Sequence, residues 1–184
     1  MELSDLVRVY PGALSRKLCR ALTIGFEALE GEHIARAEDD PAAPRFTEIN
    51  LTRSWERGHN LAFEAILPLF ERYSRDLQIS PTQWPANLAF EELRIKRYRP
   101  GLDEAFPDHV DVGDHGSARR FLAALVYLCD VDQGGATEFP GWGQSIQPEA
   151  GTVVLFPPLW PWLHAGRPPL SGPKYILSTY LHYT

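Results

Sequence analysis

From residue 88 to the end of the chain, short apolar runs alternate with glycine and proline, and this pattern constrains the fold more than any other. The run Phe121–Cys129 is almost continuously apolar, as expected of a strand that is covered on both faces. A two-sheet sandwich or jelly roll covers such a strand with short neighbours. The other strands predicted in this half are 88–98, 144–147, 152–156 and 175–183.

The first half of the chain has the periodicity of amphipathic helices. Apolar residues recur at intervals of three and four over residues 14–29 and again over residues 59–77, where Pro68 is expected to kink the helix. Residues 31–44 are rich in Glu, Asp, Ala and Pro, which predicts a mobile surface loop and a candidate lid.

A length of 184 residues is enough for one domain with a sizeable core and too short for two ordinary domains. We therefore expect a single domain over residues 1–184, mainly β with flanking helices. Residues 1–87 are expected to form mostly helical support and loop, and residues 88–184 to form the β core that carries the functional site.

Charge and hydropathy argue against several classes of partner. A formal net charge of −6 disfavours nucleic acid, because that binding depends on many Lys and Arg contacts. No apolar run is long enough to span a membrane, and the first ten residues do not have the pattern of a signal peptide. Cys19 and Cys129 lack the spacing of a disulfide framework or a zinc site, which predicts reduced thiols and a cytoplasmic location. The oligomeric state is not predicted.

Three residues from separate β segments form a candidate metal site. His109 and Asp111 are two positions apart, so they point to the same side of an extended strand, and His164 lies near another strand. Each residue alone is a weak signal, but two imidazoles and one carboxylate with open positions are the ligand set of non-heme Fe(II) oxygenases. Lys174 follows His164 by ten positions. Their joint occurrence predicts iron-dependent oxidation.

Asp114 and His115 are the competing candidates for metal ligands, because they lie on the same short segment as His109. Their spacing argues against them, and a turn that contains Gly113 and Gly116 explains these polar residues well enough. We therefore prefer the first set.

A basic cluster lies in this otherwise acidic chain, at Arg94, Lys96, Arg97 and Arg99. It either holds a carboxylate or an acidic peptide, or it is a solvated strand edge, and both interpretations stay open. Side chains alternate along a strand, so Arg94 and Lys96 share one face with Tyr98. If that face lines the pocket, Arg94 is a candidate ligand for a substrate carboxylate.

Several motifs of the second half follow one another in the order and approximate spacing of a known family. They are Tyr98-Arg99-Pro100-Gly101, His109-Val110-Asp111, Tyr127-Leu128, residues 134–140 (GGATEFP), residues 151–156 (GTVVLF), His164-Ala165-Gly166 and Gly172-Pro173-Lys174-Tyr175. With these motifs the β half resembles the 2-oxoglutarate and Fe(II)-dependent oxygenases, specifically the prolyl 4-hydroxylase-like branch. The resemblance covers residues 88–184, and the first half matches only as generic helical support.

The resemblance implies a double-stranded β-helix, or jelly roll, supported by N-terminal α-helices. It implies Fe(II) held by His109, Asp111 and His164, with 2-oxoglutarate as cosubstrate and O2 as oxidant; ascorbate is a further candidate. Lys174 is expected to pair with the far carboxylate of 2-oxoglutarate, and Arg167 is its rival.

Other residues are weaker candidates for binding. Tyr98 and Tyr127 occupy positions where the family often binds the cosubstrate, although buried tyrosines are also ordinary core residues. Ser178 shares a strand face with Lys174 and is a candidate for the same carboxylate. Trp162 is a candidate wall for the substrate, with packing as the alternative.

The resemblance implies hydroxylation of an unactivated C–H bond, coupled to conversion of 2-oxoglutarate to succinate and carbon dioxide. Asp111 favours hydroxylation over halogenation, because halogenating relatives replace this carboxylate. The expected substrate is an amino acid, a small metabolite, or a prolyl or peptide group, with a lean toward the small molecules. The alternatives are a non-catalytic metal-binding jelly-roll protein and a nucleic-acid dealkylating oxygenase.

Overall fold

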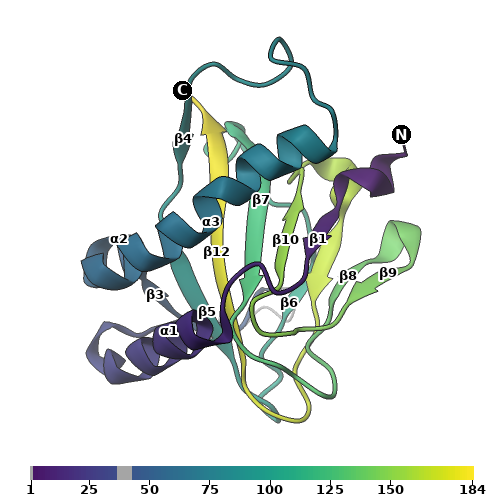
Figure 1. The fold of residues 1–184 in the computed structure, drawn as a ribbon. Helices are drawn as coiled ribbons and strands as arrows, with labels where there is room; N and C mark the ends of the chain where they lie inside the picture. The colour runs from purple at the N-terminus through teal and green to yellow at the C-terminus, as the bar shows by residue number, and fades with distance from the viewer. Residues whose placement is uncertain (1, 37–42) are drawn as a thin grey trace.

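Two antiparallel sheets pack against each other in the computed structural model, which describes residues 2–36 and 43–184 (Figure 1). The larger sheet has eight strands, in the order β1 (Arg8–Tyr10), β10 (Val153–Phe156), β7 (Arg120–Tyr127), β12 (Lys174–Tyr183), β5 (Arg94–Tyr98), β3 (Phe46–Asn50) and β2 (Ile34–Arg36), with β4 (Leu88–Phe90) paired to β12. The smaller sheet has four strands, in the order β6 (Phe106–His109), β11 (His164–Gly166), β8 (Thr137–Phe139) and β9 (Gln144–Ile146). This arrangement confirms the predicted jelly-roll core.

Strand β7 lies inside the larger sheet, flanked by β10 and β12. Leu122 and Ala124 of this strand pack toward the helices. Ala123 and Tyr127 point the other way, into the core between the two sheets. Both faces of β7 are therefore covered, as the apolar run Phe121–Cys129 predicts.

Helices cover the outer face of the larger sheet (Figure 1). They are α1 (Arg16–Ala28), α2 (Leu51–Ser54) and α3 (Glu56–Asp76). Elsewhere the chain forms the 3₁₀ turns η1 (Leu3–Leu6), η2 (Glu30–Glu32), η3 (Pro140–Trp142) and η4 (Trp160–Trp162). Ser15 caps α1, because its hydroxyl oxygen accepts a hydrogen bond from the N–H of Leu18 (3.2 Å). Helix α3 continues through Pro68, so the proline does not end it, and the kink stays a prediction. The helices predicted over 14–29 and 59–77 are confirmed.

The first half of the chain also supplies strands β1, β2 and β3, which the helical periodicity does not predict. Strand β2 lies within residues 31–44, so the prediction of a loop is wrong for residues 34–36. The candidate lid depends on residues 37–42, which are outside the described residues. Strand β3 is buried along its whole length between β2 and β5. The first half therefore builds part of the larger sheet and does more than support it.

Residues 88–98, predicted as one strand, are divided into β4 and β5 by residues 91–93. The N–H of Glu91 still bonds to the carbonyl of Tyr180 on β12 (2.9 Å), so the break keeps this segment against the sheet. It also brings Glu91 and Glu92 to the site described below.

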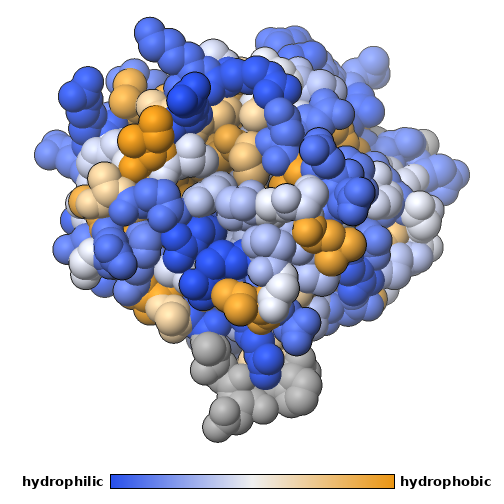
Figure 2. Space-filling view, turned by 90° about the horizontal axis from the view of Figure 1, so that it is seen from below, coloured by the Kyte–Doolittle hydropathy of each residue, from blue (hydrophilic) through white to orange (hydrophobic). Residues whose placement is uncertain are grey.

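Seen from below relative to Figure 1, the surface is largely hydrophilic, with small separate apolar patches (Figure 2). In the described part of the chain, no helix combines the length and the apolar character needed to cross a membrane. Cys19 is buried and Cys129 half-buried, and both are free thiols.

Candidate metal centre and active site

Strands β6 and β11 place two histidines side by side. His109 ends β6, His164 begins β11, and their Cα atoms are partners in the antiparallel register. Asp111 lies just beyond β6, where its N–H bonds to the carbonyl of Pro158 (3.2 Å). Its carboxylate lies 3.5 Å from Nε2 of His109 and 3.6 Å from Nε2 of His164. One donor atom from each of these residues lies within 4.8 Å of the other two. The structure thus brings the predicted ligands to one point.

Backbone carbonyls fix the orientation of both imidazoles. Nδ1 of His109 lies 2.7 Å from the carbonyl oxygen of Pro107, and Nδ1 of His164 lies 3.0 Å from that of Trp162. A carbonyl can only accept, so each Nδ1 carries the proton and each Nε2 lone pair is free for a metal. Burial lowers the pKa of His164 to about 4, although Asp111 opposes this shift. His164 is therefore neutral at pH 7, as a metal ligand must be.

Tyr180 and Arg120 hold Asp111 in place. The Tyr180 hydroxyl donates to Oδ1 of Asp111 (2.8 Å), and Nη1 of Arg120 donates to the Asp111 carbonyl (2.8 Å). Arg120 is itself fixed by two hydrogen bonds to Glu91 (2.7 and 2.8 Å). Burial would raise the pKa of Asp111, but the hydrogen bond with His109, the positive charge that the imidazoles carry when protonated and the Tyr180 hydroxyl lower it to about 2. Asp111 is ionised at neutral pH.

A narrow inner pocket lies beside the three donors, between the two sheets. Its wall includes Tyr98, Thr137, Gly166 and Tyr180 in addition to the metal-site residues. Its volume is about 30 Å³, room for one or two water molecules, so a larger ligand requires lining side chains to move. The Thr137 hydroxyl is buried and has no hydrogen-bond partner among the described residues. This unsatisfied group can bind a polar ligand.

Lys174 lies behind this pocket and is fully buried. Its ammonium donates to the carbonyls of Gly135 (2.9 Å) and Arg167 (3.1 Å) and lies 4.7 Å from the centre of the Tyr98 ring. No carboxylate of the described residues lies within ion-pair distance, and burial lowers the pKa of Lys174 to about 7. A Cβ on Gly166 would lie 3.5 Å from Nζ, so the absence of that side chain leaves the ammonium next to the pocket. A buried cation in this position is suited to an incoming anion.

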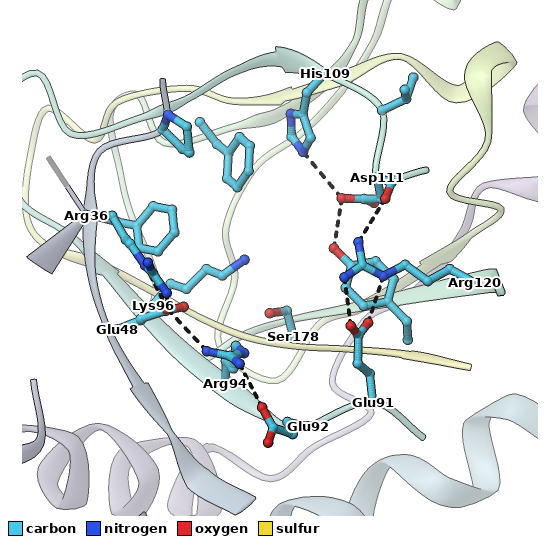
Figure 3. A pocket seen from close by; sticks show the side chains of 15 residues that line it. Arg36, Glu48, Glu91, Glu92, Arg94, Lys96, His109, Asp111, Arg120 and Ser178 are labelled. Atoms are coloured by element: carbon cyan, nitrogen blue, oxygen red, sulfur yellow. Dashed lines mark hydrogen bonds and ion pairs between the residues drawn. The ribbon is translucent and has the colours of Figure 1, made fainter. Parts of the chain in front are cut away.

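An outer pocket of about 470 Å³ adjoins the inner one. The two pockets share Lys96, Phe106, His109, Asp111 and Tyr180 in their walls. Figure 3 shows that the outer pocket is rich in charged side chains, most of them joined in pairs. The space is large enough for a small molecule or a side chain of a peptide.

Comparison with known proteins agrees with this geometry. Residues 93–182 match the family model described as the 2OG-Fe(II) oxygenase superfamily. The chain belongs to the 2OG-Fe(II) oxygenase superfamily. Its sequence is 33% identical over 108 residues to prolyl 4-hydroxylase subunit alpha-1 of Gallus gallus, covering 50% of this chain and 20% of that protein. The chain thus spans about a fifth of the length of this curated relative.

Two solved structures of prolyl hydroxylases are similar in fold. The viral collagen prolyl hydroxylase of Paramecium Bursaria Chlorella virus-1, solved as a 2OG complex, has a TM-score of 0.73 at 21% identity, with 97% of each chain covered. A prolyl hydroxylase from Trichoplax adhaerens, solved with a hypoxia inducible factor peptide fragment, has a TM-score of 0.73 at 12% identity, covering 97% of this chain and 84% of that one. Similarity at these identities supports the fold alone.

The cofactors of the superfamily, Fe(II), 2-oxoglutarate and O2, suit the residues present. Two imidazole nitrogens and an ionised carboxylate, with open space beside them, are the donor set that non-heme Fe(II) prefers. The unpaired Thr137 hydroxyl and the Lys174 ammonium match the oxygen atoms of a carboxylate. His109, Asp111 and His164 would hold the metal, and Lys174 would bind the acid.

Some of the other predicted residues lie in the candidate site. Tyr98 lines the inner pocket, while Ser178 and Arg94 line the outer one. Ser178 lies on the same side of β12 as Lys174, as the parity of the strand predicts, but it faces the outer pocket. The Arg94 guanidinium forms ion pairs with Glu48 (3.2 Å) and Glu92 (2.7 Å), so it is less available to a substrate than the sequence suggests.

Tyr127 and Trp162 are not among the residues that line the two pockets, and their binding roles stay predictions. Tyr127 is fully buried in the core between the sheets. The indole of Trp162 donates to the carbonyl of Leu3 (3.2 Å), and its own carbonyl orients His164. Both residues pack in the core between the sheets, as the alternative expects.

The alternative candidates, Arg167 for the cosubstrate and Asp114 and His115 for the metal, lie elsewhere or have other partners. The Arg167 guanidinium pairs with Glu138 (2.6 Å) and Asp108 (3.0 Å), which occupies it. Asp114 caps its own turn by accepting a hydrogen bond from the N–H of Ser117 (2.8 Å). His115 is exposed and lies outside the cluster of donors.

Sequence reasoning missed Tyr180, Thr137 and the carboxylate Glu48 as parts of the site. Tyr180 follows Ser178 by two positions, so strand parity could have placed it on the same face. Thr137 is within the GGATEFP motif, which also indicates its position. Glu48 belongs to a strand that the sequence does not predict, so no signal identified it.

Proposed function

We propose that this protein is an Fe(II)- and 2-oxoglutarate-dependent dioxygenase that hydroxylates an unactivated C–H bond of a prolyl or other peptide or amino-acid substrate. The observation that carries this proposal is the convergence of His109, Asp111 and His164 on the wall of two adjoining pockets. The overall reaction converts the substrate, 2-oxoglutarate and O2 into the hydroxylated product, succinate and carbon dioxide.

Different residues of the site have different roles in this reaction. Lys174, with the Thr137 hydroxyl, binds the far carboxylate of 2-oxoglutarate, which holds the other end of the molecule toward the three ligands. Tyr180 keeps the Asp111 carboxylate oriented through its hydrogen bond. The iron, when bound, supplies the redox chemistry that activates O2 for attack on a C–H bond.

The outer pocket is the proposed place for the substrate. It opens beside the metal ligands, and its wall contains the aromatic ring of Phe106, which stacks on His109 at 3.8 Å. The prolyl hydroxylases among the similar proteins, one of them bound to a peptide, support a prolyl or peptide substrate. Free amino acids also fit a pocket of this volume and charge.

The test incubates purified protein with Fe(II), 2-oxoglutarate and a panel of amino acids and proline-containing peptides. We expect a mass gain of one oxygen atom in at least one substrate, with succinate formed in equal amount. Succinate release that requires Fe(II), 2-oxoglutarate and O2 distinguishes an oxygenase from a metal-binding jelly-roll protein. Complete absence of succinate and product across the panel contradicts the proposal.

His109→Ala and His115→Ala form a matched pair of control variants. His109 is a proposed ligand, whereas His115 is exposed on the adjacent turn. The first variant should lose both succinate and product, and the second should retain them. Turnover that persists in His109→Ala would remove this residue from the ligand set.

A further inference from the structure

The charged side chains of the outer pocket are almost all neutralised by one another. Glu48 accepts hydrogen bonds from Arg36 (2.8 Å) and Arg94 (3.2 Å), and Arg94 also pairs with Glu92. The guanidinium of Arg120 is held by Glu91. Each of these arginines therefore has its own carboxylate, which leaves little attraction for a further anion.

Lys96 is the exception among the described cations that line the pocket. No carboxylate lies within ion-pair distance of its ammonium, and no hydrogen bond occupies it. Glu48 is its cross-strand partner in the register of β3 and β5, but Oε1 of that carboxylate is taken by Arg36 and Arg94. The pairing of the neighbours thus leaves the Lys96 amino group without a carboxylate partner, and burial lowers its pKa until an anion arrives beside it.

The Lys96 side chain also lies at the junction of the two pockets and lines both of them. Its Nζ lies 5.2 Å from the ring centre of Phe46 and 5.4 Å from that of Phe106, the ring that stacks on His109. Figure 3 shows the amino group directed into the open space between His109 and Ser178. The two aromatic rings restrain the chain, so the ammonium is presented to whatever enters the outer pocket.

We propose that Lys96 is a specificity-determining residue that binds a carboxylate of the substrate close to the carbon that is hydroxylated. This inference rests on the proposed function and defines its substrate class as carboxylic acids, such as a free or N-acylated amino acid or a peptide with its terminal carboxylate at the reacting residue. Lys174 is placed to bind the far carboxylate of 2-oxoglutarate, so that carboxylate does not reach Lys96; the lysine signals described below test whether the other carboxylate does. Amides of the same molecules lack the charge and bind poorly.

The test uses matched acids and amides, namely N-acetyl amino acids and their primary amides, with N-acetyl-L-proline and N-acetyl-L-prolinamide first. Binding is measured to protein loaded with Zn(II) and 2-oxoglutarate, which cannot turn over. Loss of a charge-assisted hydrogen bond corresponds to a preference for the acid of about 10- to 100-fold. We expect this preference in the wild type, its loss in Lys96→Met, and its partial return in Lys96→Arg. Equal binding of acid and amide in the wild type, or no binding of any acid, overturns the proposal.

Nuclear magnetic resonance of the lysine side chains gives a readout that does not depend on activity. Lys17, Lys96 and Lys174 are the lysines of the chain, so labelling the lysine ε-carbon with ¹³C gives three signals, which single substitutions assign. The acid should shift the Lys96 signal and leave that of the exposed Lys17 unchanged. If 2-oxoglutarate alone shifts Lys96 and the acid adds nothing, Lys96 binds the cosubstrate and the proposal is wrong.

The two proposals can fail separately in these experiments. If no substrate gains oxygen but Lys96 still selects acids over amides, the oxygenase proposal fails and the carboxylate site stands. If oxygen is incorporated equally into acid and amide, and Lys96→Met changes neither rate, the oxygenase stands and the carboxylate site fails. Lys17→Met is the matched control, since it removes a lysine charge remote from both pockets.

Discussion

Replacing Lys174 with methionine should weaken binding of 2-oxoglutarate and leave the affinity for the substrate unchanged. The ammonium is fully buried, so a carboxylate that enters beside it would lose a buried cationic partner. Removing one partner of a buried ion pair costs about 3–5 kcal/mol, which corresponds to an increase of between about 10²- and 10⁴-fold in the KM for 2-oxoglutarate. Lys17→Met, an exposed lysine, should leave this KM as in the wild type.

The same substitution should change how stability depends on pH. Lys174 has a pKa of about 7 in the folded protein and 10.5 as its ordinary value, because burial disfavours the charged form. The unfolded chain therefore binds more protons between these values, and the free energy of unfolding rises with pH across this window. The gain is about 5 kcal/mol at most, at about 1.4 kcal/mol per unit. Lys174→Met should lack this rise.

Two assays check this pair of expectations. Succinate formation at varied 2-oxoglutarate and fixed substrate gives the KM, and urea unfolding of the metal-free protein at pH 7 and pH 10 gives stability. Comparison of the variant with the wild type cancels the contribution of the other lysines. The reasoning is refuted if both proteins share one pH dependence and one KM for 2-oxoglutarate.

Three further substitutions test single contacts of the site. Gly166→Ala places a methyl group 3.5 Å from Nζ of Lys174 at ordinary contact distances, so the KM for 2-oxoglutarate should rise with little change in urea stability, and an unchanged KM contradicts this. Tyr180→Phe removes the hydrogen bond to Asp111 and should weaken metal affinity by about 10- to 100-fold in a Zn(II) titration; equal affinity would show that the hydroxyl does not orient the ligand. Glu48→Gln leaves two partly exposed arginines without their carboxylate, and the free energy of unfolding should fall by about 1–3 kcal/mol in urea, whereas equal stability would count against the charge network.

Features with strong local signals could be predicted from the sequence. The continuous apolar run of β7 is expected when both faces of a strand are buried, and the structure shows both faces of β7 packed against core residues. The metal site was predictable because His109 and Asp111 are close in sequence, and His164 belongs to a motif of its own. Strand pairing then brings the two histidines into register, which spacing alone does not specify.

Features that depend on tertiary pairing could not be predicted in the same way. Strand β3 contains Glu48 and Asn50, polar residues that a sequence pattern assigns to the surface, but both are buried with hydrogen-bond partners. Tyr127 and Trp162 are residue types that often line binding pockets, and only the packing of the sheets shows that they belong to the core. That the Lys96 amino group has no carboxylate partner is likewise known only from the structure, in which the neighbouring charges pair with one another.

Anaerobic titration of Fe(II) into the metal-free protein tests directly whether His109, Asp111 and His164 form one iron site. We expect one ion bound per chain, with affinity strongly reduced in His109→Ala, Asp111→Ala and His164→Ala and unchanged in His115→Ala. Wild-type affinity in all three ligand variants, or its loss in His115→Ala instead, would contradict the account.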